Sequence, residues 1–448
     1  MENTQKPSLR YAWYVVFILM LAYVSSFVDR QILSLLVKPI KRDMHLSDTE
    51  MSLLMGLSFA IFYTLLGIPI GRWADRGNRR QIIMLGIAVW SVMTALCGIT
   101  KNYFQLFLAR VGVGVGEAAL TPAAYSMISD YFPKEKLAFA LSVYSMGIYI
   151  GSGLALMVAG LAFQLASVQT TWELPLVGSI YPWQMVFFII GLPGLLISLL
   201  IFTIREPIRT QKRMIKTESG ESIAAQVSLK EVLTYINANR QSFLGISLGL
   251  ACTSLAGYAT SAWYPTVLQR VFGWSEVASG FSYGLMVAVF ATTGAGVGGS
   301  LADKFKKKGN PNANIRICMI AATGVVLSAP LFLLMPTGAL SVAFVGLPSF
   351  FTGFPIGAAA AAIQEMMPNQ MRALASAIYF FILNIIAISL GPMFTALLTD
   401  YWFANENMVH YSLLIVAIFA NIAALICLYS AQKSYTKSLQ YLENYMEK

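Results

Sequence analysis

Four ionisable residues stand well inside apolar stretches of this chain: Asp29, Arg30, Arg110 and Glu117. A charge near the centre of a bilayer costs between about 2.5 and about 17 kcal/mol, depending on the method, so such residues usually face a protein interior or a water-filled cavity. Arg110 and Glu117 are separated by two helical turns, so they lie on one face, roughly 10 Å apart along the axis. These residues are therefore the candidates for a working site inside a membrane.

Two carboxylates and two arginines favour proton and anion chemistry. A carboxyl group that moves between a wet and a dry environment can take up and release a proton. We therefore assign proton coupling to Asp29 and Glu117 and binding of an anionic substrate to Arg110 and Arg30. The alternative is an ion pair that only ties two helices together, although such a pair needs two charges and four are present here.

The composition is that of an integral membrane protein. Of the 448 residues, 57% are hydrophobic and 12% are charged, whereas about 25% charged residues is typical of soluble proteins. Apolar stretches of about 20 residues recur, which predicts membrane-spanning helices and not the alternating segments of a barrel. The predicted fold class is all-α, with twelve transmembrane helices near 12–37, 51–71, 82–100, 103–128, 138–163, 184–204, 242–269, 279–302, 315–336, 340–364, 373–399 and 409–431.

Adjacent residues on a helix point about 100° apart, so Asp29 and Arg30 cannot face the same target. One of them can pair with the span at 103–128 while the other faces a cavity. In the orientation derived below, Asp29, Arg30 and Arg110 all fall in the outer half of the membrane, and Glu117 falls near the middle. We therefore expect the four charges to form one cluster between the first and fourth spans.

Basic loops predict the orientation. Most of the 31 Lys and Arg residues lie in the termini and in the loops on the same side as the termini. By the positive-inside rule, this bias places both termini in the cytoplasm, and we expect a multi-pass protein of a bacterial inner membrane. The same rule accounts for the net charge of +10, so no nucleic-acid partner is expected.

The sequence divides into two similar halves. We expect an N-terminal six-helix bundle (1–204), a polar cytoplasmic linker (205–241) with a short amphipathic helix around Leu229–Ile236, a C-terminal six-helix bundle (242–432) and a cytoplasmic tail (433–448). GRWADRGNRR at 71–80 is echoed by GGSLADKFKKKG at 298–309, which contains Asp303 and Lys304. Asp130-Tyr-Phe-Pro133 is likewise echoed by Glu365-Met-Met-Pro368. Parallel repeats of six spans with a substrate site between them describe one large transporter architecture.

Enzymatic and metal chemistry are not expected. The four cysteines are scattered singly, without metal-ligand spacing, at Cys97, Cys252, Cys318 and Cys427. The sequence has no G-x-x-x-x-G-K-[ST] run, so ATP is not the expected energy source. We predict that the chain is not an enzyme, that it has no metal or cofactor, and that protons are its coupling ion.

The stretch GRWADRGNRR resembles the loop motif of the major facilitator superfamily, in which Gly71, Asp75, Arg76, Arg79 and Arg80 match. Asn78 stands where glycine is usual, which resembles the spinster-like branch of lysolipid and sphingolipid transporters. Three further stretches resemble the same branch: SFVDRQILSLLVKPI, LFLARVGVGVGEA and YIGSGLALMVAG. The Asp-Arg pair in the first span and the arginine in the fourth are also familiar from the anion:cation symporters of the superfamily.

These resemblances imply a monomeric secondary transporter that works by alternating access and lies among membrane lipids. The spinster-like resemblance implies an anionic or zwitterionic amphiphile of lysophospholipid or sphingoid type. The alternative is a proton symporter for a small organic anion such as a sugar acid or an aromatic carboxylate. Asp75 can accept backbone N–H groups of a facing helix and latch the halves at the cytoplasmic side; the alternative is that the basic residues of this loop only set the orientation.

Overall fold

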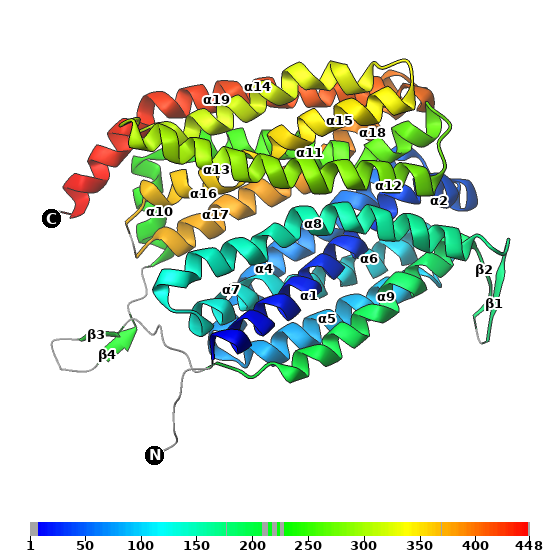
Figure 1. The fold of residues 1–448 in the computed structure, drawn as a ribbon, viewed down its shortest axis with the longest axis horizontal. Helices are drawn as coiled ribbons and strands as arrows, with labels where there is room; N and C mark the ends of the chain where they lie inside the picture. Colours follow the sequence, from blue (N-terminus) through cyan, green and yellow to red (C-terminus); the bar gives the residue numbers. More distant parts are fainter. Residues whose placement is uncertain are drawn as a thin grey trace.

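The computed structural model describes residues 8–446 apart from 176, 208–213, 217–221, 225–227 and 369. Figure 1 shows a bundle of long helices in which the first half of the chain packs beside the second. The start of α1 (Leu9–Leu35) and the end of α19 (Val409–Met446) lie at the same end of the bundle. We call this the cytoplasmic end, after the orientation predicted from the basic loops, and the opposite end the outer end.

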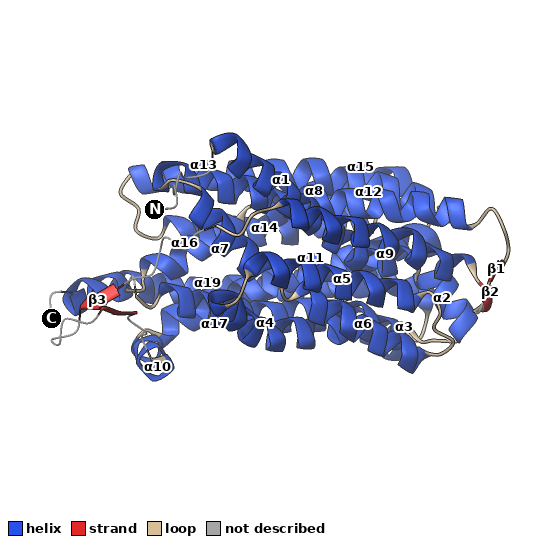
Figure 2. Cartoon of the chain, turned by 90° about the horizontal axis from the view of Figure 1, so that it is seen from below, coloured by secondary structure: helices blue, strands red, loops and turns tan. Residues whose placement is uncertain are grey.

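In the described part of the first half, helices are joined by short loops and by one strand hairpin at the outer end (Figure 2). After α1, its elements are α2 (Val37–Met44), α3 (Asp48–Ser52), η1 (Leu53–Leu57), α4 (Ser58–Arg76), α5 (Arg79–Cys97), α6 (Tyr103–Glu117), α7 (Leu120–Tyr131), α8 (Lys134–Ala166), β1 (Trp172–Leu174), β2 (Gly178–Ile180), α9 (Pro182–Leu200) and η2 (Ile201–Thr203). Strands β1 and β2 pair antiparallel, with Glu173 opposite Ser179.

The linker and the second half follow. The linker contains the antiparallel pair β3 (Met214–Lys216) and β4 (Ser222–Ala224) and the helix α10 (Leu229–Ala238). Before α19, the second half consists of α11 (Arg240–Arg270), α12 (Glu276–Met286), η3 (Val287–Ala291), α13 (Thr292–Lys307), α14 (Ala313–Leu333), α15 (Gly338–Gly353), α16 (Pro355–Glu365), α17 (Arg372–Asn384), η4 (Ile385–Leu390), α18 (Gly391–Leu397), η5 (Leu398–Trp402) and η6 (Glu406–Met408).

The predicted fold class is confirmed. In the described part of the chain, twelve helical segments are long and apolar enough to cross a membrane, and each overlaps one predicted span. The short helix predicted in the linker is present as α10. The segment 433–448, which we assigned to a tail, continues the last helix as far as Met446.

Several spans are not regular α-helices. The predicted span at 103–128 is divided into α6 and α7, and the break comes directly after Glu117. The span at 340–364 is divided before Pro355, because proline has no N–H to donate within a helix. π-helical turns occur in three further spans: η1 in the second, η3 in the eighth, and η4 and η5 in the eleventh. Such turns are frequent at functional sites.

Local sequence sets several helix starts. Ser47 begins α3 with a capping box, in which its hydroxyl accepts from the Glu50 N–H and the Glu50 side chain accepts from the Ser47 N–H. Asn78 caps α5 by accepting from the Gln81 N–H at 3.0 Å. This explains the asparagine in the loop motif, since a side-chain oxygen at this position satisfies a free helix donor.

Glycines bring α6 into close contact with its neighbours. A Cβ at Gly116 would lie 2.6 Å from the backbone N of Trp90 in α5. A Cβ at Gly114 would lie 2.7 Å from the backbone O of Phe59 in α4. Small residues allow membrane helices to approach this closely. The position of Glu117, at the end of α6, therefore depends on backbone contacts that only glycine permits.

We predict that Gly116→Ala lowers the thermal unfolding midpoint of the detergent-solubilised protein. The new methyl group would meet backbone atoms that cannot rotate away, and overpacking of this kind costs about 1–3 kcal/mol. Gly296→Ala is the matched control, because no atom lies within 4 Å of a Cβ at that position. Equal midpoints for the two variants would contradict the proposed packing role of Gly116.

Candidate functional site

The structure brings the predicted charged residues of α1 and α6 together. Arg30 donates from Nε to Oε2 of Glu117 at 2.6 Å, and its Nη2 lies 2.6 Å from the same oxygen. The Glu117 side chain is fully buried, whereas 16% of the Arg30 side chain is exposed. The arginine therefore compensates the buried carboxylate and also reaches an accessible space.

Arg110 and Asp29 lie deeper. Arg110 is fully buried and donates from Nη1 to the backbone oxygen of Asp29 at 2.9 Å. Several buried polar atoms of this cluster have no hydrogen-bond partner among the described atoms. They are Arg110 Nε and Nη2, Asp29 Oδ1 and Glu117 Oε1. Leaving such groups unpaired costs about 1–3 kcal/mol each, and more when they are charged. A buried region with spare donors and acceptors is thus positioned between α1 and α6, where groups can exchange partners or protons.

A cavity lies beside Arg30 between the two halves of the chain. From the first half it is lined by α1, η1 and α4, and from the second half by α11, η4 and α18. Its lining residues are Phe27, Arg30, Gln31, Ser34, Met55, Phe59, Tyr258, Ser261, Ala262, Ile388 and Pro392. Arg30 is the only lysine, arginine, aspartate or glutamate among these residues, so the cavity combines one cation with neutral polar and apolar walls.

Aromatic rings surround the Arg30 guanidinium. Its carbon Cζ lies 5.1 Å from the ring centre of Phe27, 4.5 Å from that of Phe59 and 4.9 Å from that of Tyr63. Cation–π contacts of this length stabilise a desolvated guanidinium and fix its plane. Arg30 is thus held at the cavity wall by rings as well as by Glu117.

The two predicted substrate-binding arginines differ in access. Arg30 lines the cavity, whereas Arg110 is enclosed by protein in this conformation. The role of Arg110 therefore stays a prediction for a conformation in which its surroundings open. The lining residues Gln31 and Ser261 were missed. Gln31 directly follows the Asp-Arg pair, which is a usable signal, but nothing in the sequence around Ser261 separates it from other helix serines.

The loop motif makes its described contacts within the first half and with the linker. Arg79 is buried and contacts Asp130 at 2.5 Å and Glu206 at 2.7 Å. The Arg80 N–H donates to Glu206 at 3.0 Å, and Gly71 lies in α4. The side chains of Asp75 and Arg76 lie outside the described part of the structure. A gating role for the motif stays a prediction.

The second half repeats this arrangement of an acid and a base. Glu365 pairs with Lys306 and accepts from Asn314 Nδ2 at 3.0 Å. Glu365 follows the tenth span as Asp130 follows the fourth, and each of these acids pairs with a base of its own half. Asp303 and Lys304, the predicted second-half motif residues, are exposed.

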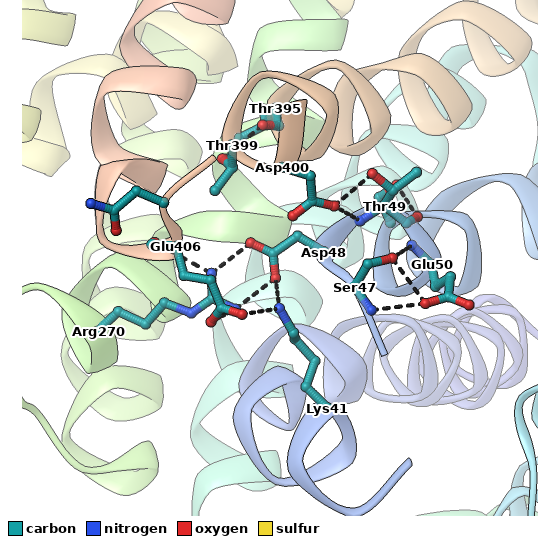
Figure 3. Close-up of polar contacts among 12 residues, drawn as sticks. Lys41, Ser47, Asp48, Thr49, Glu50, Arg270, Thr395, Thr399, Asp400 and Glu406 are labelled. Carbon is teal, nitrogen blue, oxygen red and sulfur yellow. Dashed lines mark hydrogen bonds and ion pairs between the residues drawn. The ribbon is translucent and has the colours of Figure 1, made fainter. Parts of the chain in front are cut away.

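A polar network that the sequence did not reveal joins the two halves at the outer end (Figure 3). We call Lys41, Asp48, Arg270 and Glu406 the outer latch. Asp48 is fully buried, and both of its oxygens accept from Arg270, at 2.6 and 2.7 Å. Lys41 pairs with Asp48 and also contacts Glu406 at 2.8 Å.

Asp400 strengthens the same closure. Its Oδ2 accepts from both the N–H and the hydroxyl of Thr49, each at 2.7 Å. Asp400 ends the eleventh span and Thr49 begins the second, so the carboxylate caps a helix of the other half. Hydrogen bonds between the halves that involve described residues are found at the cavity and at the outer end. The outer end is therefore closed in this conformation.

Comparison with known proteins agrees with this architecture. The model of the Major Facilitator Superfamily matches residues 19–392. An "MFS-type efflux pump" of Mycolicibacterium smegmatis is 28% identical over 403 residues, covering 89% of this chain and 87% of the relative. A "Probable L-galactonate transporter" of Escherichia coli is 25% identical, covering 86% of this chain and 82% of the relative.

A solved structure is similar over nearly the whole chain. It is a bacterial homologue of the human lysosomal transporter spinster, in an inward-facing and unoccupied conformation. It has 28% sequence identity and a TM-score of 0.76, and the match covers 97% of this chain and 98% of that one.

The fold and the charged cavity define a membrane transporter of two six-helix halves. The chain belongs to the Major Facilitator Superfamily. Within that superfamily it is a spinster-like transporter.

We predict that Arg270→Gln shifts the protein towards conformations that are open at the outer end. The change leaves buried Asp48 with Lys41 alone, and breaking a buried ion pair costs about 3–5 kcal/mol. The distance between spin labels on the outer ends of α2 and α19 should increase and broaden.

Arg42→Gln is the control for this prediction. Its side chain is 73% exposed and pairs with Asp43 within the same half, so the label distances should not change. Unchanged distances in Arg270→Gln would show that the outer latch does not hold the halves together.

Proposed function

We propose that this protein is a proton-coupled secondary transporter of an anionic or zwitterionic amphiphile of lysophospholipid or sphingoid type. The observation that carries the proposal is the Arg30–Glu117 pair at the wall of an otherwise uncharged cavity. In the empty site, the two charges compensate each other. A substrate anion that binds Arg30 competes directly with Glu117 for the same guanidinium.

Charge balance links the anion to a proton. If an anion pairs with Arg30 while Glu117 stays ionised, two negative groups share one cation in a poorly hydrated site, which is costly. A proton on Glu117 removes this cost and frees the guanidinium for the substrate. Loss of the proton restores the ion pair and expels the anion. Asp29, with an unpaired Oδ1 beside the Arg110 contact, is the second proton carrier in this proposal.

In this proposal, alternating access moves the substrate from one side of the membrane to the other. The outer latch closes the outer end in this conformation, so exchange with the cavity takes place from the cytoplasmic end. The similar bacterial spinster homologue is described as inward-facing, which supports the same assignment. Opening the outer latch while the cytoplasmic end closes would expose the cavity to the other side.

The walls of the cavity support an amphiphile. Apolar side chains from both halves of the chain line the cavity around Arg30. They are Phe27, Met55 and Phe59 from the first half and Ile388 and Pro392 from the second. An acyl or sphingoid chain can pack against such residues while its head group binds the guanidinium. The likeness to a spinster homologue supports this choice.

A small organic anion is the second candidate. The single cation at the cavity and the likeness to a probable L-galactonate transporter both favour it. A carboxylate of a sugar acid or an aromatic acid would bind Arg30 in the same way and need the same proton. The two candidates differ in whether the ligand has an apolar chain that packs against the apolar walls of the cavity.

We predict that Glu117→Gln abolishes accumulation driven by a pH gradient in proteoliposomes and leaves counterflow of the same substrate. A glutamine cannot carry the proton, but it leaves the cavity and Arg30 in place. Asp29→Asn should lower accumulation in the same assay.

The control is Glu443→Gln, because this carboxylate is exposed near the end of α19. It should transport as the wild type does. Full pH-driven accumulation by both Glu117→Gln and Asp29→Asn would rule out the assigned proton carriers.

We predict that single-chain amphiphiles inhibit transport of a labelled lysophospholipid, and that millimolar sugar acids have little effect. The apolar walls contribute binding energy only to a ligand with a chain, at about 25 cal/mol per Å² of buried apolar surface. Competition is measured in proteoliposomes below the critical micelle concentration. Strong inhibition by sugar acids together with none by amphiphiles would favour the organic-anion candidate.

A further inference from the structure

One hydrogen bond crosses between the halves inside the cavity itself. Gln31 of α1 donates from Nε2 to the hydroxyl oxygen of Ser261 in α11 at 2.6 Å, and both residues line the cavity. Gln31 directly follows Arg30 on the same helix. Arg30 and the Gln31–Ser261 pair therefore line the same cavity.

The pair has hydrogen-bonding capacity to spare. A glutamine amide has two N–H donors and an acceptor oxygen, and a serine hydroxyl has one donor and two acceptor positions. Their mutual bond uses one donor of Gln31 and one acceptor position of Ser261. Ser34, which also lines the cavity, donates its hydroxyl to the backbone oxygen of Gln31 at 2.7 Å. That hydroxyl is thus engaged within its own helix, whereas Gln31 and Ser261 meet across the cavity.

We propose that Gln31 and Ser261 form a hydroxyl-binding subsite, so that the transported anion carries a hydroxyl group close to the charge that binds Arg30. The proposal rests on the proposed anion transport and specifies the substrate class further. A ligand hydroxyl both donates and accepts, so it can bridge the amide and the serine or replace their mutual bond.

The chemistry of the pair selects against other groups. A second anionic group at this position would find no cation among the lining residues other than Arg30, and an unpaired charge in such a site is costly. An apolar group would separate the pair and leave polar atoms unpaired, which is the usual basis for rejecting a ligand that lacks a hydroxyl. A neutral hydroxyl satisfies both residues.

The position of the subsite connects recognition to conformational change. Gln31 belongs to the first half and Ser261 to the second, so a hydroxyl bound by both contacts the two bodies that move in alternating access. Arg30 contacts the anion from the first half alone. The hydroxyl is therefore the part of the ligand through which the second half can sense an occupied site.

Two sources supply this chemistry: the glycerol or sphingoid hydroxyl of a single-chain phospholipid, and the hydroxyl of a hydroxy acid. The experiment measures dissociation constants for two ligand pairs with purified protein in nanodiscs. One pair is 1-acyl-lysophosphatidate and its 2-deoxy analogue. The other is 2-hydroxyhexanoate and hexanoate.

We expect wild-type protein to bind the hydroxylated member of at least one pair about threefold to tenfold more tightly, the range for one hydrogen bond. Ser261→Ala and Gln31→Leu should each remove this preference while both members of the pair still bind to each variant, which also shows that the variants are folded. Thr260→Val is the matched control and should retain the preference, because the Thr260 hydroxyl donates to Ala256 O of its own helix at 2.8 Å.

The outcomes separate the two proposals. A preference for the hydroxylated member of the lipid pair alone identifies an amphiphile as the substrate. A preference in the acid pair alone identifies a small hydroxy acid. Either result supports the hydroxyl-binding subsite. Equal binding of the two members of every pair by the wild type, or an unchanged preference in Ser261→Ala, overturns the subsite and leaves anion transport standing. If no anion binds or is transported by the wild type, the proposed function fails and the subsite fails with it.

Discussion

The ion pair between Arg30 and Glu117 constrains the whole first half of the molecule. Glu117 is fully buried, and a buried carboxylate without its partner would carry a large desolvation cost. The pair therefore ties α1 to the end of α6. Gly114 and Gly116 make this possible, because they let α6 approach α4 and α5 closely enough to place Glu117 beside the cavity. Packing and charge placement are thus parts of one constraint.

Ion pairs elsewhere in the structure divide into two kinds. Arg79 with Asp130, and Lys306 with Glu365, each join elements of one half near the cytoplasmic end. The outer latch instead joins the two halves. The first kind can persist while the halves move, because both partners belong to the same body. The second kind must break for the outer end to open, so its strength contributes directly to the equilibrium between conformations.

The sequence was sufficient to predict the spans and to single out the charged residues of the candidate site. Both rest on rarity: apolar runs of about 20 residues and ionisable groups inside them have few explanations. The difference in access between Arg30 and Arg110 could not be predicted, because it depends on which face of each helix meets a cavity. The outer latch was also missed. Charges at helix ends are common, and Asp48 and Arg270 lie 222 positions apart, so no local pattern connects them.

The cavity owes its position to irregular helix geometry as well as to side chains. Met55 of η1 and Ile388 of η4 both line it. Between these π-helical turns the backbones meet directly, because a Cβ at Gly56 would lie 2.5 Å from the backbone oxygen of Ile388. A contact between bare backbones has no interlocking side chains to disengage. The second and eleventh spans can therefore be tightly packed in one conformation and still separate in another, as the proposed alternating access requires.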